Sequence, residues 1–397
     1  MRSCLLILAT VSVLTSSVLA DDKVPLPPLE PEVENKLNSW LNKHSSTPEE
    51  YIVAKFANRD IVFIGEFHRI RHDPILVQNV IPLLYENGIY NLGLEFICAR
   101  DQASVDSLLS ASSYNQAEAN RVFWNGWPFW GYQEYVDILK AAWLLNHQLP
   151  EGSRLFRVIG LDAFSDWSGV WKPEDKQAPD FREQVYPEGD RDEMMANVIK
   201  REILANGGKA LIYSGSNHAF TRFQYAAVDA ITGEIIERRS KRMGHRIYRE
   251  IADRCFFIFL HAPWDAAIGS PDRLVYPADG VIDALFQNRL PEERRCGFDV
   301  VGSPFGRLPG KTSYWSHSSE KFNLEMFCDG WIYQMPISEY EGVIVIPDWF
   351  NEANHEEAIA QIMNPDPRVK NRDRSVEDLV KILSRSADIK RRFAKFH

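Results

Sequence analysis

Apolar residues in this chain recur in short runs that are rich in β-branched and aromatic side chains. Longer stretches with helical periodicity separate the runs. Short apolar runs of this kind are typical of strands buried on both faces, and their alternation with helices predicts a β-α-β rhythm. The sequence therefore predicts an α/β fold with a mainly parallel β-sheet flanked by helices. The five predicted strands cover residues 61–64, 90–94, 156–161, 210–213 and 255–260.

Helices and one further strand are predicted around this central pattern. Residues 34–57 are expected to form a peripheral helix, and residues 74–87 and 191–205 are expected to form helices between strands. After residue 300 the chain becomes rich in turn residues. A short apolar strand is then predicted at 342–347, followed by a basic helical tail at 376–396.

One segment, residues 122–135, is unusually rich in tryptophan, phenylalanine and tyrosine. It predicts either a lid beside a ligand site or an aromatic-rich helical cap packed on the core. The expected organisation of the whole chain is a signal peptide (1–20), a linker with a peripheral helix (21–50), an α/β domain (51–265) with an aromatic insertion at about 115–190, and a C-terminal extension of unassigned role (266–397).

The first twenty residues have the composition of a signal peptide. Arg2 gives a basic start, a nearly apolar stretch follows, and Val18-Leu19-Ala20 fits a signal-peptidase site. We therefore expect an exported protein, located in the periplasm or outside the cell. The apolar stretch is short for a transmembrane helix of ~20 residues, and no other run is long enough, so no transmembrane span is expected in the mature protein.

The net charge narrows the class of expected binding partner, and the cysteine spacing bears on zinc binding and disulfides. The net charge is −10, which disfavours a nucleic acid and leaves a small-molecule or peptide substrate. The basic residues at 390–392 allow a weak association with an anionic envelope surface, although a solvated helix face explains them more simply. Four cysteines remain after cleavage of the leader, and their spacing neither forms a zinc motif nor selects a disulfide pairing. They are Cys98, Cys255, Cys296 and Cys328.

Ionisable side chains follow the predicted strands at the point where each strand ends. The carboxyl ends of parallel strands meet at one edge of a sheet, so residues distant in sequence converge there and ligands bind there. Carboxylates and imidazoles without thiolates suit a divalent cation, and a carboxylate outside the coordination shell can activate water. The side chains in question are Glu66, His68, Glu95, Asp162, His218 and His261.

These residues also carry a family resemblance. Two G-x-x-H motifs at residues 65–68 and 215–218, with Glu95 between them, resemble the superfamily of erythromycin esterases, Tiki metalloproteases with their TraB/PrgY relatives, and ChaN-like haem-binding lipoproteins. Arg191 occupies the place of an arginine that begins a helix before the second motif in the ChaN and Tiki branches. The likeness is greatest to ChaN-like haem-uptake and Tiki-type domains, and it covers residues 51–262.

The resemblance implies an α/β domain with its site at the strand ends, and it implies catalytic roles for Glu66, His68, Glu95, Arg191 and His218. We therefore expect a metal-dependent hydrolase acting on an ester or amide bond, with manganese, cobalt or zinc activating a water molecule. The expected metal ligands are Glu66, His68, Glu95 and His218, and strand position adds Asp162 and His261 as further candidates.

Arg191 has two interpretations. In the first, it stabilises a developing oxyanion or orients a carboxylate of the substrate. In the second, it forms a buried salt bridge to Glu66 or Glu95. A serine nucleophile is disfavoured because the chain has no G-x-S-x-G motif, and a nucleotide site is disfavoured because it has no P-loop motif.

Two alternatives to the metal-dependent hydrolase stay open. The first is a haem-binding protein of the ChaN type, in which Tyr132 and Tyr135 of the aromatic segment would contact the haem. The second is a metal-independent esterase, in which His68 would serve directly as the general base. All three share one site and differ in what occupies it.

Overall fold

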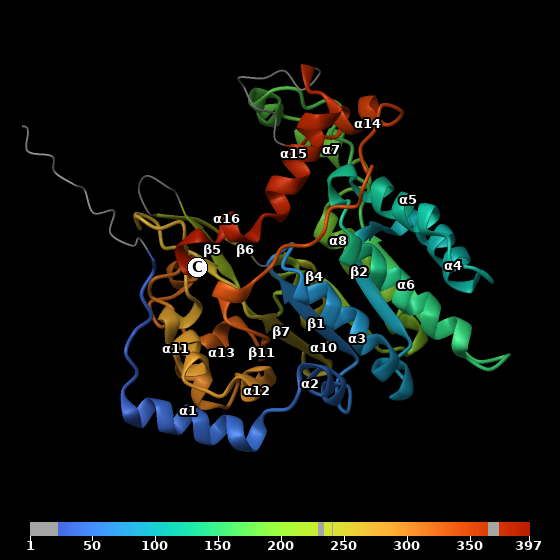
Figure 1. Cartoon of the computed structure of the whole chain (residues 1–397). Helices are drawn as coiled ribbons and strands as arrows, with labels where there is room; N and C mark the ends of the chain where they lie inside the picture. The colour runs from blue at the N-terminus through green and yellow to red at the C-terminus, as the bar shows by residue number, and fades with distance from the viewer. Residues whose placement is uncertain (1–22, 229–233, 240, 364–372) are drawn as a thin grey trace, which may run out of the picture.

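A computed structural model describes residues 23–228, 234–239, 241–363 and 373–397, so the predicted signal peptide lies outside the described residues. At its centre is a seven-stranded sheet with the order β10-β11-β7-β1-β4-β2-β3 (Figure 1). Every neighbouring pair is parallel except β10 with β11. The α/β fold is confirmed, and all five predicted strands are present. The strands are β1 (Ile61–Glu66), β2 (Asn91–Cys98), β3 (Arg157–Asp162), β4 (Ala210–Gly215), β7 (Cys255–Leu260), β10 (Cys296–Asp299) and β11 (Gly330–Tyr333).

Helices and short hairpins surround the sheet. The helices are α1 (Pro31–His44), α2 (Pro48–Lys55), α3 (His72–Glu86), α4 (Gln102–Ser110), α5 (Gln116–Gly126), α6 (Gln133–Gln148), α7 (Phe181–Val185), α8 (Arg191–Glu202), α9 (Ser216–Ala219), α10 (Met243–Ile251), α11 (Val281–Gln287), α12 (Pro291–Arg294), α13 (Leu324–Phe327), α14 (His355–Ala360), α15 (Val376–Ala387) and α16 (Ile389–Arg392). The hairpins pair β5 (Tyr225–Val228) with β6 (Ile235–Arg239), and β8 (Trp264–Asp265) with β9 (Leu274–Val275).

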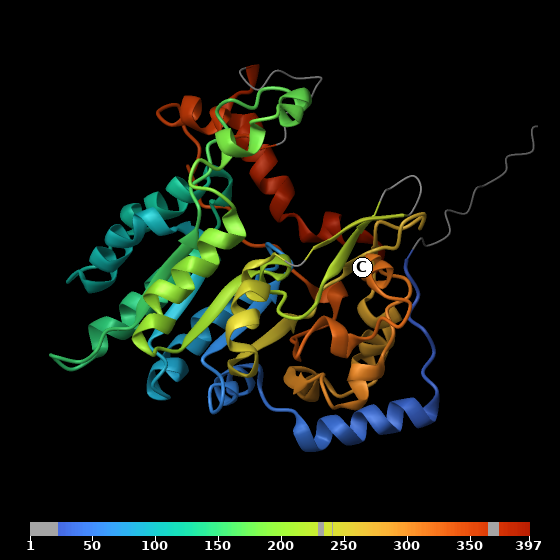
Figure 2. The same cartoon turned by 180° about the vertical axis from the view of Figure 1, so that it is seen from behind.

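Successive side chains of each strand point to opposite faces, and this separates two hydrophobic cores. Val62 and Ile64 of β1 pack in one core with residues from α2, α3, α4, α5 and α6. Ile61 and Phe63 pack in the other with residues from α1, α8, α10 and α11. Figure 1 shows α3 and α6 in front of the sheet, and Figure 2 shows the opposite face. The central strands are therefore covered on both sides, as their continuous apolar sequence predicts.

Side-chain caps fix the start of the helices that matter for the site. The Asp190 carboxylate accepts a hydrogen bond from the Glu193 amide at 2.9 Å and so begins α8 at Arg191. Such a cap stabilises a helix by about 1 kcal/mol relative to alanine. The chain between β3 and α8 includes α7, and it returns so that Arg191, the first residue of α8, contacts Asp162 at the carboxyl edge of the sheet.

The structure corrects three sequence predictions. The helix expected over 34–57 is two helices, because α1 ends at His44 and Pro48 begins α2. The strand expected at 342–347 is wrong: the segment makes only isolated bridges, Ile70 to Gly342 and Tyr132 to Val345. The helical tail is divided into α15 and α16, with Asp388 capping the second.

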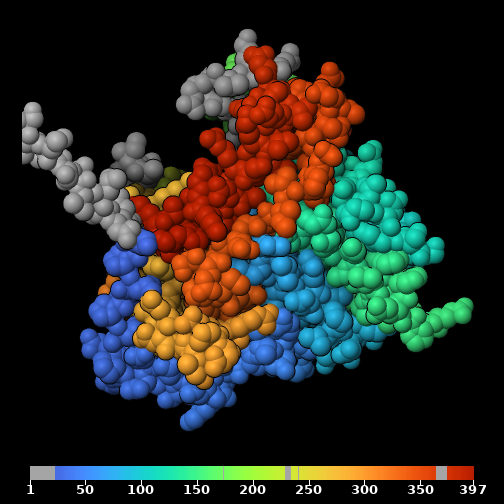
Figure 3. Space-filling view, viewed as in Figure 1, coloured from blue at the N-terminus to red at the C-terminus, as the bar shows by residue number. Residues whose placement is uncertain are grey.

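The C-terminal third contributes to the central sheet, which the sequence does not predict. Strands β10 and β11 continue the sheet beyond β7, and each is only four residues long. The chain then crosses the front of the molecule as a band that Figure 3 shows in orange to red. Its end returns to the site, where the Arg392 guanidinium donates to the carbonyl of His68 at 2.9 Å.

Cys98, Cys255, Cys296 and Cys328 are buried free thiols, so the disulfides that the sequence allowed are not formed. Burial is the main cause that raises the thiol pKa of all four, which keeps them protonated and unreactive. In the part of the chain that the structure describes, no helix is both long and apolar enough to cross a membrane.

Candidate functional site

The parallel strands bring five of the predicted residues to one edge of the sheet. Glu66 is the last residue of β1, and His68 lies in the turn that follows. Glu95 lies on β2, Asp162 ends β3, and His218 lies in α9 directly after β4. The carboxyl edge of the sheet is therefore where the sequence placed the site.

Glu66 and His68 form a hydrogen-bonded pair. The Glu66 carboxylate is almost completely buried and lies 2.6 Å from Nδ1 of His68. The hydroxyl of Tyr135 donates to the same carboxylate at 2.6 Å, and the hydroxyl of Tyr213 donates to its second oxygen. Burial, followed by the charge of Glu66, raises the pKa of both tyrosines, so both remain donors. Glu66 is thus fixed in place and holds the His68 ring.

The other ring nitrogen of His68 is left for chemistry. Because the carboxylate accepts from Nδ1, the tautomer leaves a lone pair on Nε2. Among the described residues Nε2 has no hydrogen-bond partner. The His68 ring lines a cavity and lies edge-on to Trp130, with ring centroids 5.0 Å apart.

Glu95 is held as a carboxylate by two hydrogen-bond donors and by a nearby histidine. The Gly215 amide donates to one oxygen at 2.6 Å, and Arg191 donates to the other at 2.9 Å. Nε2 of His218 lies 3.3 Å from the latter oxygen. Burial alone would raise the pKa of Glu95, but the charges of His218 and Arg191 lower it to about 2. Glu95 is therefore ionised and unsuited to act as an acid.

His218 lies between two carboxylates. Its Nδ1 lies 2.7 Å from Asp192, which also accepts from Arg242 at 3.0 Å and from the Met243 amide at 2.8 Å. Burial favours the neutral ring, but Glu95 and Asp192 outweigh it and raise the pKa of His218. The raised pKa favours the protonated ring, whose Nε2 lies 3.3 Å from Glu95 and 3.4 Å from Nη1 of Arg191.

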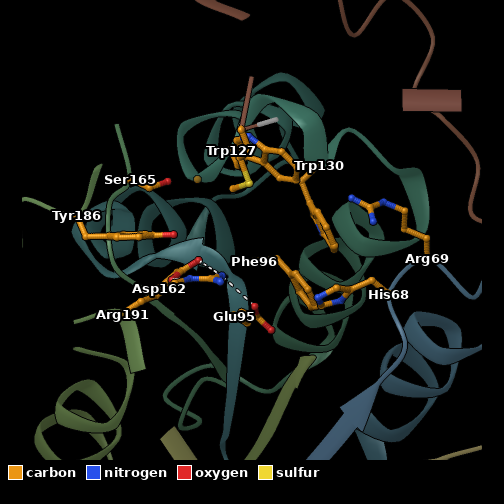
Figure 4. Close-up of a pocket in the computed structure, with 12 residues that line it drawn as sticks. His68, Arg69, Glu95, Phe96, Trp127, Trp130, Asp162, Ser165, Tyr186 and Arg191 are labelled. Carbon is orange, nitrogen blue, oxygen red and sulfur yellow. Dashed lines mark hydrogen bonds and ion pairs between the residues drawn. The ribbon is translucent and has the colours of Figure 1, made fainter. Parts of the chain in front are cut away.

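Arg191 forms the salt bridge that was one of its two interpretations. Its guanidinium contacts both oxygens of Asp162 at 2.5 Å and also contacts Glu95, but not Glu66. Burial would lower the pKa of Arg191, and the charges of Asp162 and Glu95 raise it instead. The guanidinium remains at the cavity wall, as Figure 4 shows.

The cavity at this edge has a volume of about 290 Å³, small enough for a compact ligand. One wall is polar and the other aromatic (Figure 4). Phe96 and Trp130 stack with an interplanar angle of 9°, and Trp127 continues the aromatic wall. The lining residues are His68, Arg69, Glu95, Phe96, Gly126, Trp127, Trp130, Asp162, Ser165, Tyr186, Arg191 and Met363.

The predicted metal ligands do not fit a divalent cation in this arrangement. Both oxygens of Glu66 and of Glu95 already accept hydrogen bonds. Nδ1 of His218 is paired with Asp192, and its Nε2 lies between Glu95 and Arg191. A cationic guanidinium, Arg191, occupies the position between Glu95 and Asp162. Within the described residues, no group of three or more His, Cys, Asp or Glu side chains is arranged to hold a metal ion.

His261 and the two haem-contact candidates lie outside the cavity. His261 pairs with Asp283 at 2.9 Å and is buried. Tyr132 and Tyr135 are fully buried beneath the aromatic wall, and neither lines the cavity. Their hydroxyl groups are engaged by Arg69 and Glu66, so they are not free to contact a haem.

Several residues of the site were not identified from the sequence. Tyr213 lies inside an apolar strand, where a tyrosine is indistinguishable from a core residue until its hydroxyl is located. Asp192 was visible beside Arg191, but its contact with His218 depends on the fold. Trp127 and Trp130 belong to the aromatic segment, which forms both a core cap and part of the cavity wall.

Comparisons with known proteins show which structures this chain is similar to. No protein-family model matches the chain, and the search of curated proteins gives no match. A succinoglycan biosynthesis protein matches with a TM-score of 0.52 at 9% identity, covering 80% of this chain and all of the other. A mutant of the erythromycin esterase EreC in its open conformation matches with a TM-score of 0.44 at 15% identity, covering 71% of this chain and 91% of the other.

A third structure, the cofacial haem complex of ChaN from Campylobacter jejuni, matches with a TM-score of 0.33 at 14% identity, covering 56% of this chain and 87% of the other. At these identities the likeness shows the α/β fold, and the chemistry must be argued from the site.

Proposed function

We propose that this protein is an esterase that activates water with His68 and requires no metal ion. The observation that supports this is the Glu66–His68 pair: Nδ1 is held by a buried carboxylate, and Nε2 is free at the wall of a cavity. A base oriented by a third group, beside a space for substrate, is the arrangement that general-base catalysis needs. The metal-dependent version has less support, because its ligands are engaged with one another.

In the proposed reaction, Nε2 of His68 removes a proton from water as the water oxygen attacks the ester carbonyl carbon. The negative charge moves to the carbonyl oxygen, where Arg191 donates a hydrogen bond to it. Glu66 stabilises the imidazolium that forms. The tetrahedral intermediate then expels the alcohol, which takes the proton back from His68, and the carboxylic acid is released.

The size of the cavity favours a small ester over a peptide chain. About 290 Å³ accommodates an acyl or alcohol group of the size of an aromatic ring, and the stacked Phe96 and Trp130 present an apolar face to it. Esters also have better leaving groups than amides, so a single histidine suffices as acid and base.

The test is hydrolysis of a panel of para-nitrophenyl esters by the wild type and by His68→Gln and Glu66→Gln. We expect His68→Gln to lower kcat by about 100-fold to 10,000-fold, with KM little changed. His147→Gln, an exposed histidine on α6, is the matched control and should retain the wild-type rate. A Glu66→Gln variant with full activity would contradict the role of the pair.

We also infer export from the leader at residues 1–20. Expression of the full chain followed by fractionation should recover a shortened protein that begins at Asp21. Recovery of the uncleaved chain from the cell interior would contradict this inference.

A further inference from the structure

The cavity contains a second arginine that the proposed hydrolysis does not use. Arg69 follows His68 directly, is half-buried and lines the cavity. Its guanidinium lies 4.5 Å from the centroid of the Trp130 ring, and its Nε donates to the hydroxyl of Tyr132 at 2.9 Å. Figure 4 shows Arg69 on the other side of the cavity from Asp162 and Arg191.

Within the described ranges, the charge of Arg69 is not compensated by a carboxylate. Among the described residues, none lies within the 4.0 Å ion-pair distance of its guanidinium, whereas Arg191 contacts both Asp162 and Glu95. Arg392 lies nearby and bonds only carbonyl oxygens, those of His68 and Ser386. Burial, and then the charge of Arg69, lower the pKa of Arg392 to about 10. Arg69 and Arg392 thus place two neighbouring positive charges near this side of the cavity.

The backbone of Arg69 is held in an unusual conformation. Its φ is +76°, a region that non-glycine residues seldom adopt and that the surrounding structure must maintain. The Arg69 amide donates to the hydroxyl of Tyr135 at 2.9 Å, and the same hydroxyl donates to Glu66. The position of the guanidinium is thus tied to the Glu66–His68 pair.

We propose that the cavity selects esters that carry a carboxylate group, and that Arg69 binds this carboxylate. The proposal rests on the esterase function above. Tyr132 occupies Nε, so the two Nη groups remain for a paired contact with the two oxygens of the ligand. The apolar part of the substrate lies against Phe96, Trp127 and Trp130, and the ester carbonyl faces His68. A guanidinium already stacked on an aromatic ring loses little freedom on binding.

The kinetic test compares para-nitrophenyl hemiglutarate with its uncharged analogue, para-nitrophenyl pentanoate. We expect the wild type to prefer the hemiglutarate in kcat/KM by about tenfold or more, the effect of a hydrogen bond between charged groups. Arg69→Gln should lower kcat/KM for the hemiglutarate more than for the pentanoate and so lose the preference, and Arg69→Lys should retain part of it. Arg121→Gln, an exposed arginine on α5 outside this cavity, is the matched control.

Retention of the wild-type preference in Arg69→Gln, or a wild type without a preference, would overturn the proposal. Thermal unfolding of each variant checks that the fold is intact.

A binding measurement separates this proposal from the esterase function itself. Calorimetry with benzoate and with uncharged benzamide requires no catalysis. Binding of benzoate alone, lost in Arg69→Gln, supports the carboxylate site even if no ester is hydrolysed, in which case only the proposed function fails. Equal binding of the two compounds, or none, contradicts the role of Arg69.

Discussion

Replacement of Gly215 by alanine tests whether the position of the His68 ring controls activity. Gly215 ends β4 with φ −55° and ψ 141°, a conformation open to alanine, so the backbone itself does not oppose the change. A Cβ atom at this position would lie 2.7 Å from Cε1 and 2.9 Å from Nε2 of His68. Both distances are shorter than real Cβ contacts, and the His68 ring must move.

The magnitude follows from this displacement. Contacts of 2.7 and 2.9 Å must lengthen by several tenths of an ångström or more, which moves Nε2 relative to the cavity and stretches the 2.6 Å contact of Nδ1 with Glu66. A displacement of about 1 Å in a catalytic group costs about 100-fold in rate. The free energy of unfolding should change by only about 1 kcal/mol, because loss of glycine flexibility in the unfolded chain offsets part of the strain.

The assay is kcat/KM on the best para-nitrophenyl ester, together with the unfolding midpoint in urea. Gly169→Ala is the matched control, because a Cβ there would meet only Gln184 Oε1, at 3.7 Å. We expect a loss of about 100-fold for Gly215→Ala and none for Gly169→Ala. Full activity in Gly215→Ala, with the fold intact, would refute the view that Nε2 of His68 is the reacting atom.

Three further predictions concern the carboxylates of the site. Tyr213→Phe leaves an oxygen of buried Glu66 without its donor, so urea unfolding should show a loss of about 1–3 kcal/mol; unchanged stability would contradict the assigned contact. In Asp192→Asn the His218 ring loses one of its two carboxylates, so NMR titration should show a lower pKa for His218 than in the wild type. An unaltered titration would show that Asp192 does not raise the pKa of His218. The pKa of Glu95 is lowered from 4.5 to about 2, so its contribution to stability is complete above pH 4.5 and disappears as the pH falls toward 2. Over that range the wild type should therefore lose stability more steeply than Glu95→Gln, and parallel curves would show that Glu95 is not held as a carboxylate.

The sequence predicts the central sheet because its strands are long apolar runs buried on both faces. It does not predict β10 and β11, because four-residue strands such as Cys296–Asp299 in a turn-rich region carry too little periodicity. The sequence also predicts a strand near Val345 that is not formed, because the segment is a short apolar run. Val343 and Ile346 are buried and Ile344 is exposed, and the segment forms single bridges to Ile70 and Tyr132 rather than a ladder.

The sequence predicts at which edge of the sheet the candidate residues meet, but not which of their side chains pair with one another. Glu66, Glu95 and Asp162 are visible in the sequence as polar residues after strands, and the parallel topology brings them to one edge. Which of them pairs with which cation depends on where α8 begins, because this fixes whether Arg191 meets Asp162 or Glu66. Arg191 on α8 pairs with Asp162 on β3 and with Glu95 on β2. The carboxylates expected to bind a metal therefore form ion pairs instead.

The measurement that tests the central claim most directly is ester hydrolysis by metal-free protein. Purified protein is dialysed against a strong chelator, its metal content is measured by elemental analysis, and the rate is determined before and after addition of zinc, manganese or cobalt. The proposed mechanism requires an unchanged rate after metal removal and no increase on addition, with activity dependent on His68. A rate that disappears with the metal and returns on its addition would contradict it, and iron with a haem absorption band would favour the haem-binding alternative.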